Sequence, residues 1–481
     1  MERGCGVLLP ISSLPNKYGF GCFSAEAYEF VDYLADLGMK YWQILPLCTL
    51  DEHGSPYSSV SAFAGEPLYI DLEALLSEEE IGQFNLSRDM SFEKYRKNKT
   101  DALKYVFKKL YYSTDIDEFL AEHENWVYDY AVYMAIKGEL GVGYTKFPKE
   151  FKDPDSEETI AFVKEHDEEV LYYIFLQYVF FKQWQKLKNY AGEKGIKIIG
   201  DVPIYCSMDS VDMYASKKNF LLNDKGIPTY ISGVPGDYFN PDGQIWGNPL
   251  YDYDYMKQTK FSWWVHRIKH VSKLYDFVRI DHFRGFESFF AVPYGEKTVK
   301  NGVWIKGPGM DIFEEFYRNG ITNLILEDLG NISYAVRALR RRTGLAGMKV
   351  MQFAFDGDEK NTNLPHEYEK NSVAYLGTHD NDTFMGFLQD EKNKSVFCTY
   401  LGLPQNADDK IVTRMAIENL LSTNSNVCIL LMQDILCEGS EKRINTPGKA
   451  DGNWMYKLPE TYADDDYNTY LKQLIKFKNR D

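Results

Sequence analysis

The sequence has no long apolar run and no pattern of a secretory leader. No segment reaches the roughly 18 consecutive apolar residues that a membrane span needs. The opening residues, MERGCGVLLPISSLP, contain neither the apolar core nor the small-residue cleavage site of a signal peptide. We therefore expect a cytoplasmic protein that does not associate with a membrane.

The cysteines do not form any pattern that would define a site. The seven cysteines show no paired spacing, which argues against a disulfide framework and against a Cys-based zinc site. Cys5, Cys48, Cys206 and Cys428 lie in or beside apolar runs, and we expect them to be small buried hydrophobic side chains.

Positive charge is scarce, and this excludes a large class of partners. The chain carries 54 Lys and Arg against 71 Asp and Glu, a formal net charge of −17. Such a chain repels the phosphates of nucleic acids and anionic membranes, so we expect neither as a partner. A neutral, hydroxyl-rich ligand fits better, because 15% of the residues are aromatic and sugar rings pack their C–H faces on aromatic side chains.

Eight short β-rich runs recur along the chain, each followed by polar residues. Their near-continuous apolar character is typical of strands buried on both faces, as in a parallel sheet. The runs are Gly6–Pro10, Tyr41–Leu47, Ile196–Tyr205, Phe277–Gly285, Asn323–Gly330, Lys349–Gly357, Ser372–Asp380 and Val427–Asp434.

Segments with a helical spacing of apolar residues lie between several of these runs. We expect helices over Ala25–Gly38, Leu171–Tyr190 and Ser333–Arg342. Eightfold alternation of strand and helix predicts an α/β fold, a (β/α)8 TIM barrel that forms a single catalytic domain over residues 1–481. The active site of such a barrel lies at the C-terminal strand ends. Six acids are expected there: Asp201, Asp281, Glu327, Asp356, Asp380 and Asp434.

Two insertions interrupt the alternation, one after the second strand and one after the third. Residues from approximately 77 to 190 are charged, Tyr-rich and helical in pattern, and they predict a helical subdomain. Residues from approximately 206 to 275 contain the loop SGVPGDYFNPDGQIWGNP, which carries Tyr238, Phe239 and Trp246. Long ordered loops are usually functional, so we expect this loop to contribute to the site and Trp246 to stack on sugar.

The rim acids suit the chemistry of glycosidic bonds. In retaining enzymes a carboxylate attacks the anomeric carbon and a carboxylic acid, about 5–5.5 Å away, protonates the leaving group. Asp281 and Glu327 end the fourth and fifth strands, and neighbouring strands lie about 4.8 Å apart, so the two carboxyls can meet this separation. We expect Asp380, at the end of the seventh strand, to hold two sugar hydroxyls on the opposite wall.

The residues beside these acids predict their charge states. Arg279 lies two residues before Asp281, on the same face of the strand, and is expected to keep Asp281 ionised as a nucleophile must be. The apolar run before Glu327 is expected to raise its pKa, so that it stays protonated as a general acid. His282 and His379 each adjoin a rim acid and are expected to donate to sugar hydroxyls.

Simpler interpretations exist for single residues. An acid at a strand end is often a helix cap or the partner of a loop salt bridge, and Asp328 and Asp434 fit that description. Trp246 alone would commonly be a core residue. The combination of R-x-D-H, E-D and H-D-N-D on three strands is much harder to explain by structure alone.

Two other functions stay open at this point. A zinc-dependent amidohydrolase would need clustered His ligands, and the eight His do not cluster. A catalytically silent glucan-binding scaffold would not need the complete set of acids.

At these residues the chain resembles glycoside hydrolase family 77, the 4-α-glucanotransferases known as amylomaltases or disproportionating enzymes. The resemblance extends from Gly6 to Trp454. It rests on SPYSSVSAFAG, GDVPIY, PGDYFNPDGQIWGNPLY, VRIDHFRGF, ILEDLG, MKVMQFAFDG, LGTHDNDT and RINTPG followed by NW.

The resemblance implies roles for individual residues. Asp281 resembles the nucleophile that forms a covalent glycosyl-enzyme, Glu327 the general acid/base and Asp380 the transition-state stabiliser. The loop with Trp246 resembles a flap over the cleft, and Asn445 is expected to contact sugar. Further residues that would surround the reactive glucose are Tyr57, Asp201, Arg279, His282, Asp356 and His379.

The implied reaction is retaining transfer of α-1,4-glucan segments, with maltooligosaccharides, amylose and glucose as partners and with no catalytic metal or organic cofactor. The spacing of the residues does not decide between transfer and hydrolysis, so an amylase-like α-1,4-glucan hydrolase remains the alternative. The chain departs from the family at Glu66, where Asn is usual, at Gly236, where a second Pro is common, and at Tyr253, where Trp is frequent. We expect these departures to affect flap mobility or product size.

Overall fold

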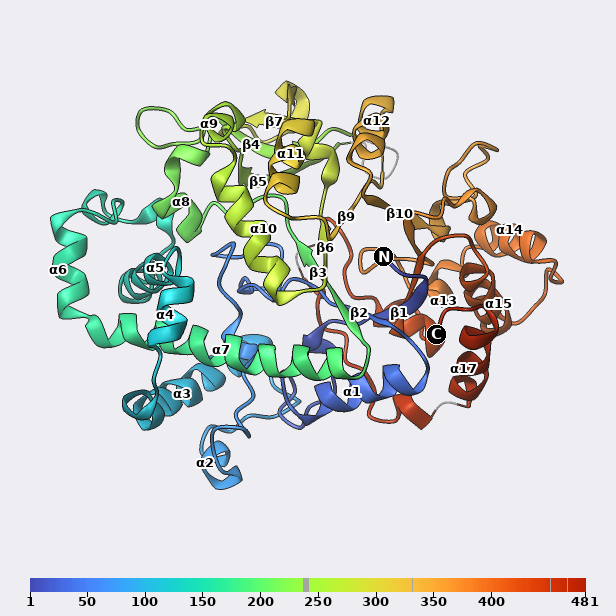
Figure 1. Ribbon diagram of the computed structural model, residues 1–481, viewed down its shortest axis with the longest axis horizontal. Coiled ribbons are helices and arrows are strands. Elements are labelled where there is room, and N and C mark those ends of the chain that lie inside the picture. Colours follow the sequence, from blue (N-terminus) through green and yellow to red (C-terminus); the bar gives the residue numbers. More distant parts are fainter. Residues whose placement is uncertain (237–241, 331, 450, 465) are drawn as a thin grey trace.

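A closed barrel of eight parallel strands lies at the centre of the computed structural model, which describes residues 1–236, 242–330, 332–449, 451–464 and 466–481 (Figure 1). The strands follow one another around the barrel in the order β1-β12-β11-β10-β9-β6-β3-β2, which confirms the (β/α)8 prediction. Their bounds are β1 Gly4–Leu8, β2 Tyr41–Gln43, β3 Lys197–Val202, β6 Phe277–Ile280, β9 Leu324–Leu326, β10 Ala346–Val350, β11 Ser372–Tyr375 and β12 Val427–Leu431.

The barrel strands are shorter than most of the apolar runs that predict them. β2 covers only the first residues of the run Tyr41–Leu47, and β10 ends at Val350 although its run extends to Gly357. Apolar residues after β2 and β10 continue into the loops at the barrel rim and are still buried, among them Ile44, Leu45 and Met351. Apolar character therefore reports burial at the rim as well as strand structure.

Helices surround the barrel, and the three that the sequence predicts are all present. The longest, α7, extends beyond both ends of its predicted segment because it packs along α5 as well as against the barrel. Ser333 caps α12, its hydroxyl accepting from the Val336 N–H over 3.3 Å. The bounds are α1 Ala25–Asp36, α7 Asp167–Glu193, α10 Ser262–Leu274, α11 Met310–Arg318, α12 Tyr334–Thr343, α13 Phe384–Phe387, α14 Glu391–Leu401, α15 Asp409–Leu421, α16 Met432–Ile435 and α17 Tyr467–Phe477.

The connection between β2 and β3 is largely helical. It consists mainly of helices that extend away from the barrel on one side of the molecule and of α7, which leads back to β3 (Figure 1). Besides α7, these helices are α2 Glu78–Gly82, α3 Phe92–Leu110, α4 Asp117–His123, α5 Val127–Leu140 and α6 Glu157–Glu165.

The segment after β3 contains more regular structure than the predicted flap loop. It holds α8 (Val211–Ala215), β4 (Tyr230–Val234), β5 (Gln244–Pro249) and α9 (Tyr253–Gln258). β4 pairs with β5 and with β7 (Ser288–Pro293), and β7 pairs with β8 (Val303–Lys306), so two loops build one antiparallel sheet in the order β5-β4-β7-β8. The sequence analysis did not predict β7 and β8.

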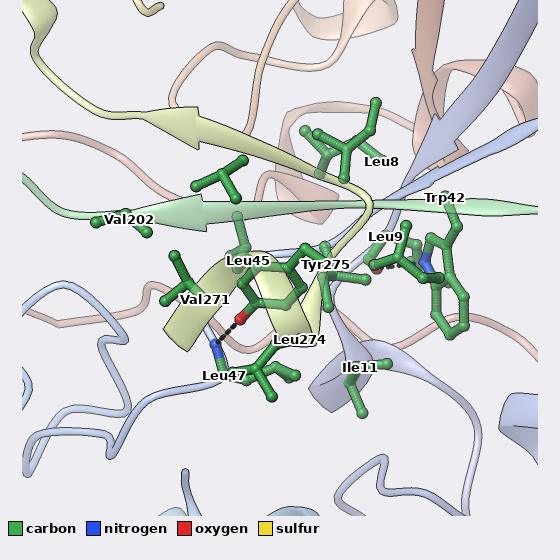
Figure 2. Close-up of a cluster of buried hydrophobic side chains, with 14 of the residues drawn as sticks. Leu8, Leu9, Ile11, Trp42, Leu45, Leu47, Val202, Val271, Leu274 and Tyr275 are labelled. Atoms are coloured by element: carbon green, nitrogen blue, oxygen red, sulfur yellow. Dashed lines mark hydrogen bonds between the residues drawn. The ribbon is translucent and has the colours of Figure 1, made fainter. Parts of the chain in front are cut away.

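Close packing beneath β3 brings the chain segments of the rim together. The hydroxyl of Tyr275 accepts from the Leu47 N–H over 3.2 Å, as Figure 2 shows. A Cβ atom at Gly200 would lie 2.1 Å from the ring of Tyr275, so only glycine fits there. This packing sets the position of the next residue of β3, Asp201, whose role is described below.

Three of the four cysteines predicted to be buried are buried, and Cys48 is half-buried; all seven cysteines are free. Within the described ranges, none of the helices combines the length and the apolar character required to cross a bilayer.

Candidate active site

Asp281 and Glu327 come from neighbouring strands of the barrel. Asp281 directly follows β6 and Glu327 directly follows β9. The two strands pair with Ile280 opposite Leu326, and the Glu327 N–H donates to the Ile280 carbonyl over 3.0 Å. The predicted adjacency of these strands is confirmed. Asp281 and Glu327 are therefore the first residues beyond the last paired residues of β6 and β9, and they lie side by side at the end of the sheet.

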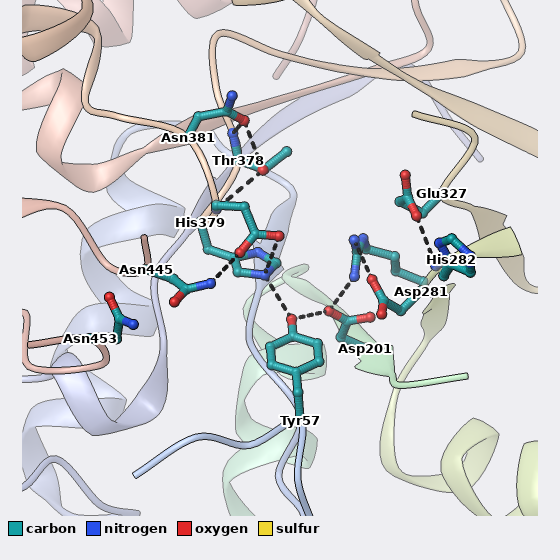
Figure 3. A network of polar contacts seen from close by, with 12 residues as sticks. Tyr57, Asp201, Asp281, His282, Glu327, Thr378, His379, Asn381, Asn445 and Asn453 are labelled. Carbon is teal, nitrogen blue, oxygen red and sulfur yellow. Dashed lines mark hydrogen bonds and ion pairs between the residues drawn. The ribbon is translucent and has the colours of Figure 1, made fainter. Parts of the chain in front are cut away.

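Arg279 joins two carboxylates at this rim. Its Nη1 donates to Asp201 Oδ2 over 2.6 Å and its Nη2 donates to Asp281 Oδ1 over 2.9 Å (Figure 3). The side chains of Arg279 and Asp201 are 4% and 1% exposed, whereas that of Asp281 is 29% exposed. Asp201 therefore holds the guanidinium on its buried side, and Asp281 is the carboxylate that a ligand can reach.

Backbone groups hold both carboxyl oxygens of Glu327. The His282 N–H donates to Oε2 and the Leu329 N–H donates to Oε1, each over 2.8 Å. His282 has a φ of 47°, in the left-handed region that costs energy for a residue with a Cβ atom. The hydrogen bond to Glu327 helps to offset that strain, and it directs the segment after Asp281 toward the Glu327 carboxyl.

Tyr57 connects Asp201 to His379. Its hydroxyl donates to Asp201 Oδ2 over 2.7 Å, and the hydroxyl oxygen of Tyr57 also lies 2.9 Å from His379 Nε2. Because the hydroxyl proton is directed to Asp201, the oxygen accepts from the ring, and His379 therefore carries its proton on Nε2. The two rings stack with centroids 5.4 Å apart and planes inclined by 10°.

Asp380 is held by a loop near the C-terminus. The Asn445 side-chain amide donates to Asp380 Oδ1 over 2.6 Å, and the Asn445 N–H donates to the His379 carbonyl over 3.1 Å. The guanidinium of Arg443 donates to the carbonyls of Asp380 and Asn445 over 2.5 and 2.7 Å. The second carboxylate oxygen, Oδ2, lies 3.4 Å from His379 Nε2, and the side chain of Asp380 is 42% exposed, so a ligand can reach it.

Burial raises the pKa values of the two paired acids by different amounts. Burial raises the pKa of Asp281 to about 6, with the opposing effect of Arg279 second in size and the charges of Asp201 and Asp380 adding to the increase. Burial raises the pKa of Glu327 to about 8, and the charge of Asp281 contributes although Arg279 opposes it. Arg279 thus weakens the effect of burial on Asp281 without cancelling it. Near neutral pH, Asp281 is mostly ionised and Glu327 mostly protonated.

The two histidines of the site are neutral near pH 7. Burial lowers the pKa of His282 to about 4, and the charge of Arg284 contributes. Burial also lowers the pKa of His379, although the neighbouring Asp380 opposes this effect. Neutral rings of this kind can exchange hydrogen bonds with hydroxyl groups without adding charge to the site.

Trp246 lies beside the rim. It belongs to β5, is 39% exposed, and its ring meets that of His282 edge-on with centroids 4.9 Å apart. This position differs from that of a core tryptophan. Tyr238 and Phe239, which the sequence analysis placed in the same flap, lie outside the described residues.

The strand placement predicted for Asp356 is wrong. β10 ends at Val350, and the chain continues through a short 3-10 helix, Met351–Phe353, before it reaches this acid. Asp356 is exposed, and its carboxylate accepts from the Asp358 N–H over 2.9 Å. The polar turn after the 3-10 helix carries the residue away from the strand end, so any contact with sugar stays a prediction.

Asp328 and Asp434 have structural partners, as the simpler interpretation proposes. Asp328 forms an ion pair with Arg340, 3.2 Å from Nε, and accepts from the Met348 N–H over 2.8 Å. Asp434 lies within α16, fully buried, and accepts from the Phe384 N–H over 2.6 Å.

Two residues of the site were not singled out from the sequence, namely Arg443 and Trp454. The ring of Trp454 lies 5.7 Å from that of Tyr57 and 6.2 Å from that of His379, and its φ is 64°. Both residues belong to the RINTPG and NW motifs, which were noted without roles. An Arg and a Trp within a Gly/Pro/Asn-rich loop are the sequence features that could have indicated a role for both residues.

One departure from the family pattern has a local explanation. Glu66 is buried and its carboxylate accepts from the N–H groups of Leu50 and Leu68, over 2.7 and 3.0 Å. It therefore joins two loops below the rim.

Among the residues that the structure describes, no three or more His, Cys, Asp or Glu side chains are grouped as metal ligands. The zinc amidohydrolase alternative therefore has no ligand set within this part of the chain.

The fold and the site together define a (β/α)8-barrel enzyme of the class that acts on glycosidic bonds through paired carboxyl groups. A family model described as 4-alpha-glucanotransferase matches residues 9–462. The chain belongs to this family, glycoside hydrolase family 77, and it is a 4-α-glucanotransferase.

Individual relatives agree with this assignment. The chain is 42% identical over 489 residues to a 4-alpha-glucanotransferase of Clostridium butyricum, covering 98% of this chain and 99% of the relative. It is 38% identical over 489 residues to that of Aquifex aeolicus, with 100% of both chains covered. The amylomaltase of Streptococcus agalactiae, solved in complex with acarbose, matches with a TM-score of 0.93 and 36% identity over 100% of both chains. Transfer is therefore favoured over the hydrolase alternative.

Proposed function

We propose that this enzyme transfers segments of α-1,4-glucans from a donor to an acceptor chain by double displacement at Asp281 and Glu327. The observation that carries this proposal is the difference between the two carboxyls, one bound by Arg279 and mostly ionised, the other buried and mostly protonated. A retaining mechanism requires one acid in each state. Maltooligosaccharides and amylose are the proposed donors, in keeping with the family and with the acarbose complex of the related amylomaltase.

In the first step a carboxylate oxygen of Asp281 attacks the anomeric carbon of the donor. The carboxyl proton of Glu327 moves to the glycosidic oxygen, the bond between this oxygen and the anomeric carbon breaks, and the reducing-end segment leaves with a new hydroxyl. The remaining segment is then an ester of Asp281.

In the second step Glu327, now a carboxylate, removes the proton from the 4-hydroxyl of an acceptor glucan. The hydroxyl oxygen attacks the anomeric carbon, the ester bond breaks and the carboxylate of Asp281 is restored. Two inversions at one carbon leave the α configuration unchanged. Glucose is the smallest proposed acceptor.

The remaining rim residues are proposed to hold the sugar that reacts. Asp380 keeps Oδ1 on Asn445 and Oδ2 near His379, and we assign a sugar hydroxyl to its Oδ2, because the side chain is 42% exposed. His282 is proposed as a neutral partner for another hydroxyl. His379 is 3% exposed and its Nε2–H is directed to Tyr57, so we propose that it positions Tyr57 and Asp380 around the sugar. Asp201 acts through Arg279 and Tyr57, because its own side chain is buried.

Trp246 is proposed to cover the bound acceptor. Its ring lies edge-on to His282, the residue after Asp281, and it remains partly exposed. A sugar stacked on this face would displace water from the anomeric carbon, which favours transfer over hydrolysis. The proposed flap is the part of residues 206–275 that precedes the barrel helix α10.

Incubation of the purified enzyme with maltotriose tests the proposal. Transfer yields glucose together with maltooligosaccharides longer than the substrate, while the number of reducing ends stays constant. Only shorter products with a rising number of reducing ends would show a hydrolase instead.

The role of Asp281 is tested by Asp281→Asn, which we expect to lose all turnover while its melting temperature stays near that of the wild type. The exposed Asp101, in a surface ion pair with Lys97, provides the matched control Asp101→Asn, which should keep full activity. An active Asp281→Asn variant would exclude Asp281 as the nucleophile.

A further inference from the structure

A cavity lies outside the rim of the barrel. It has a volume of about 530 Å³ and is lined by α9, the segment after β8, and helices α11 and α12. These helices lie along one side of the molecule in Figure 1. None of the residues assigned above to the reacting sugar lines this cavity. Its size is within the range of about 300–1,000 Å³ typical of small-molecule sites.

Charged groups of both signs line the cavity in equal number. The cations are Lys257, Lys306 and Arg342, and the anions are Asp254, Glu287 and Asp311. Lys257 and Asp311 pair across 2.6 Å, whereas the side chains of Lys306, Arg342 and Asp254 have no ion pair within the described ranges. A phosphate or other anion would meet three carboxylates here. A neutral ligand rich in hydroxyls can donate to the carboxylates and accept from the cations.

The rest of the lining is apolar. Phe261 and Leu339 are buried and contribute side chains to the wall together with Met310. Tyr253, one of the departures from the family pattern, begins α9 and also lines the cavity. Apolar surface beside hydrogen-bonding groups of both kinds suits a sugar, whose ring has C–H faces and whose edge carries hydroxyls.

The floor of the cavity is hydrogen-bonded to the segment that follows Asp281. The Gly309 N–H donates to the Phe286 carbonyl and the Gly307 N–H donates to the Glu287 carbonyl, each over 2.8 Å. Phe286 ends the 3-10 helix Phe283–Phe286, which begins directly after His282. The cavity is therefore built on the same short stretch of chain as the active site.

We propose that this cavity is a second binding site for α-1,4-glucan, which holds a remote part of a long donor or acceptor. The choice of ligand rests on the proposed function, and the balanced charges and mixed lining support a neutral oligosaccharide. A glucan bound at two places on one enzyme dissociates more slowly than one bound at the rim alone. The site therefore favours long chains over maltotriose.

Calorimetric titration with maltotetraose tests the proposal in the Glu327→Gln enzyme, in which the substrate is consumed about 10²–10⁴ times more slowly. We expect two binding events. Ala338 lies on the cavity wall, and adding Ala338→Trp places an indole ring in the cavity and obstructs it, so that one event remains. Tyr334, on the same helix α12 but 82% exposed, provides the control Tyr334→Ala, which should keep both events. A single event before cavity filling, or two events after it, would overturn the proposal.

A milder variant covers the case in which Ala338→Trp does not fold. Arg342→Ser removes one exposed donor from the cavity without adding volume, and it should weaken the second event about tenfold. In the otherwise wild-type enzyme it should raise the KM for amylose by about tenfold and leave the KM for maltotriose unchanged. An unchanged KM for amylose contradicts the site. Failure of the wild type to disproportionate maltotriose would overturn the proposed function instead, whatever the titration shows.

Discussion

The Nη2 atom of Arg279 lies 2.9 Å from Oδ1 of Asp281, and this contact opposes the effect of burial on the pKa of the carboxyl. The same guanidinium is fixed by Asp201 through Nη1 at 2.6 Å. Asp201, which is buried and out of reach of a ligand, thus fixes the position of the Arg279 guanidinium.

Arg279→Met should raise the pKa of Asp281 above its value of about 6, because the carboxylate loses its cation while remaining buried. The acid limb of the pH profile of kcat/KM should therefore move to higher pH. We expect kcat/KM at pH 7 to fall by about 10²–10³. Arg279→Lys keeps a charge and should shift the limb less; an acid limb at the wild-type position in the Met variant would refute this role of Arg279.

The activity should depend on pH with a maximum between about pH 6 and pH 8, because Asp281 must be ionised and Glu327 protonated. The acid and alkaline limbs of this pH profile report the pKa values of the two interacting acids as a pair, not of each residue alone.

Glu327→Gln should lower kcat on maltotriose by about 10²–10⁴, since the leaving oxygen receives no proton.

A glycosyl fluoride separates the two tasks of Glu327. Fluoride leaves without a proton, so the Glu327→Gln enzyme should still form the ester at Asp281, and the ester should accumulate because no base activates the acceptor. Mass spectrometry of the intact protein measures this adduct. Its absence in Glu327→Gln, together with its presence in the wild type, would contradict the assignment of Glu327.

Trp246→Ala should reduce kcat/KM for transfer by about tenfold, the effect of roughly one aromatic contact. It should also increase the fraction of donor that is hydrolysed, because water can reach the ester. The side chain is 39% exposed, so the melting temperature should change little. Trp246→Phe keeps a ring and should retain most of the transfer; equal ratios of transfer to hydrolysis in all three enzymes would exclude this role.

His123 should make the fold sensitive to acid. Its Nδ1 accepts from the Trp126 indole N–H over 3.2 Å, and burial lowers its pKa to about 4. The pKa in the unfolded chain is about 6.5, so below that pH the unfolded state binds more protons and the free energy of unfolding falls until the folded ring also titrates.

Between pH 6.5 and pH 4.5 this loss should amount to about 2 kcal/mol for His123. Urea unfolding at the two pH values measures it. His123→Gln should reduce the difference by about this amount. Identical differences in the wild type and in His123→Gln would contradict the prediction.

The barrel and the paired acids could be predicted because their signals are local. An apolar run marks each buried strand, and the residue after it must lie at the rim, so Asp281 and Glu327 follow directly from β6 and β9. The prediction fails for Asp356, because the apolar run continues into the 3-10 helix after β10. Burial alone does not show where a strand ends.

The small antiparallel sheet could not be predicted in the same way. β7 and β8 lie after β6 in the chain, yet β7 pairs with β4, which in turn pairs with β5 in the loop after β3. Nothing in the composition of one loop indicates that it pairs with another. The cavity between α9, α11 and α12, which includes the end of β8, is for this reason also not predictable from the sequence.

The sequence by itself determined the order of the barrel strands and that Asp281 and Glu327 follow two of them directly, since a buried strand and the residue after it are marked by neighbours along the chain. Only the tertiary structure decided that Arg279 bridges Asp201 and Asp281, and that Asn445 and Arg443 hold Asp380. It also decided the protonation of the acids, because a pKa depends on burial and on charges that are distant in the chain. For Asp281 these effects together outweigh its nearest cation.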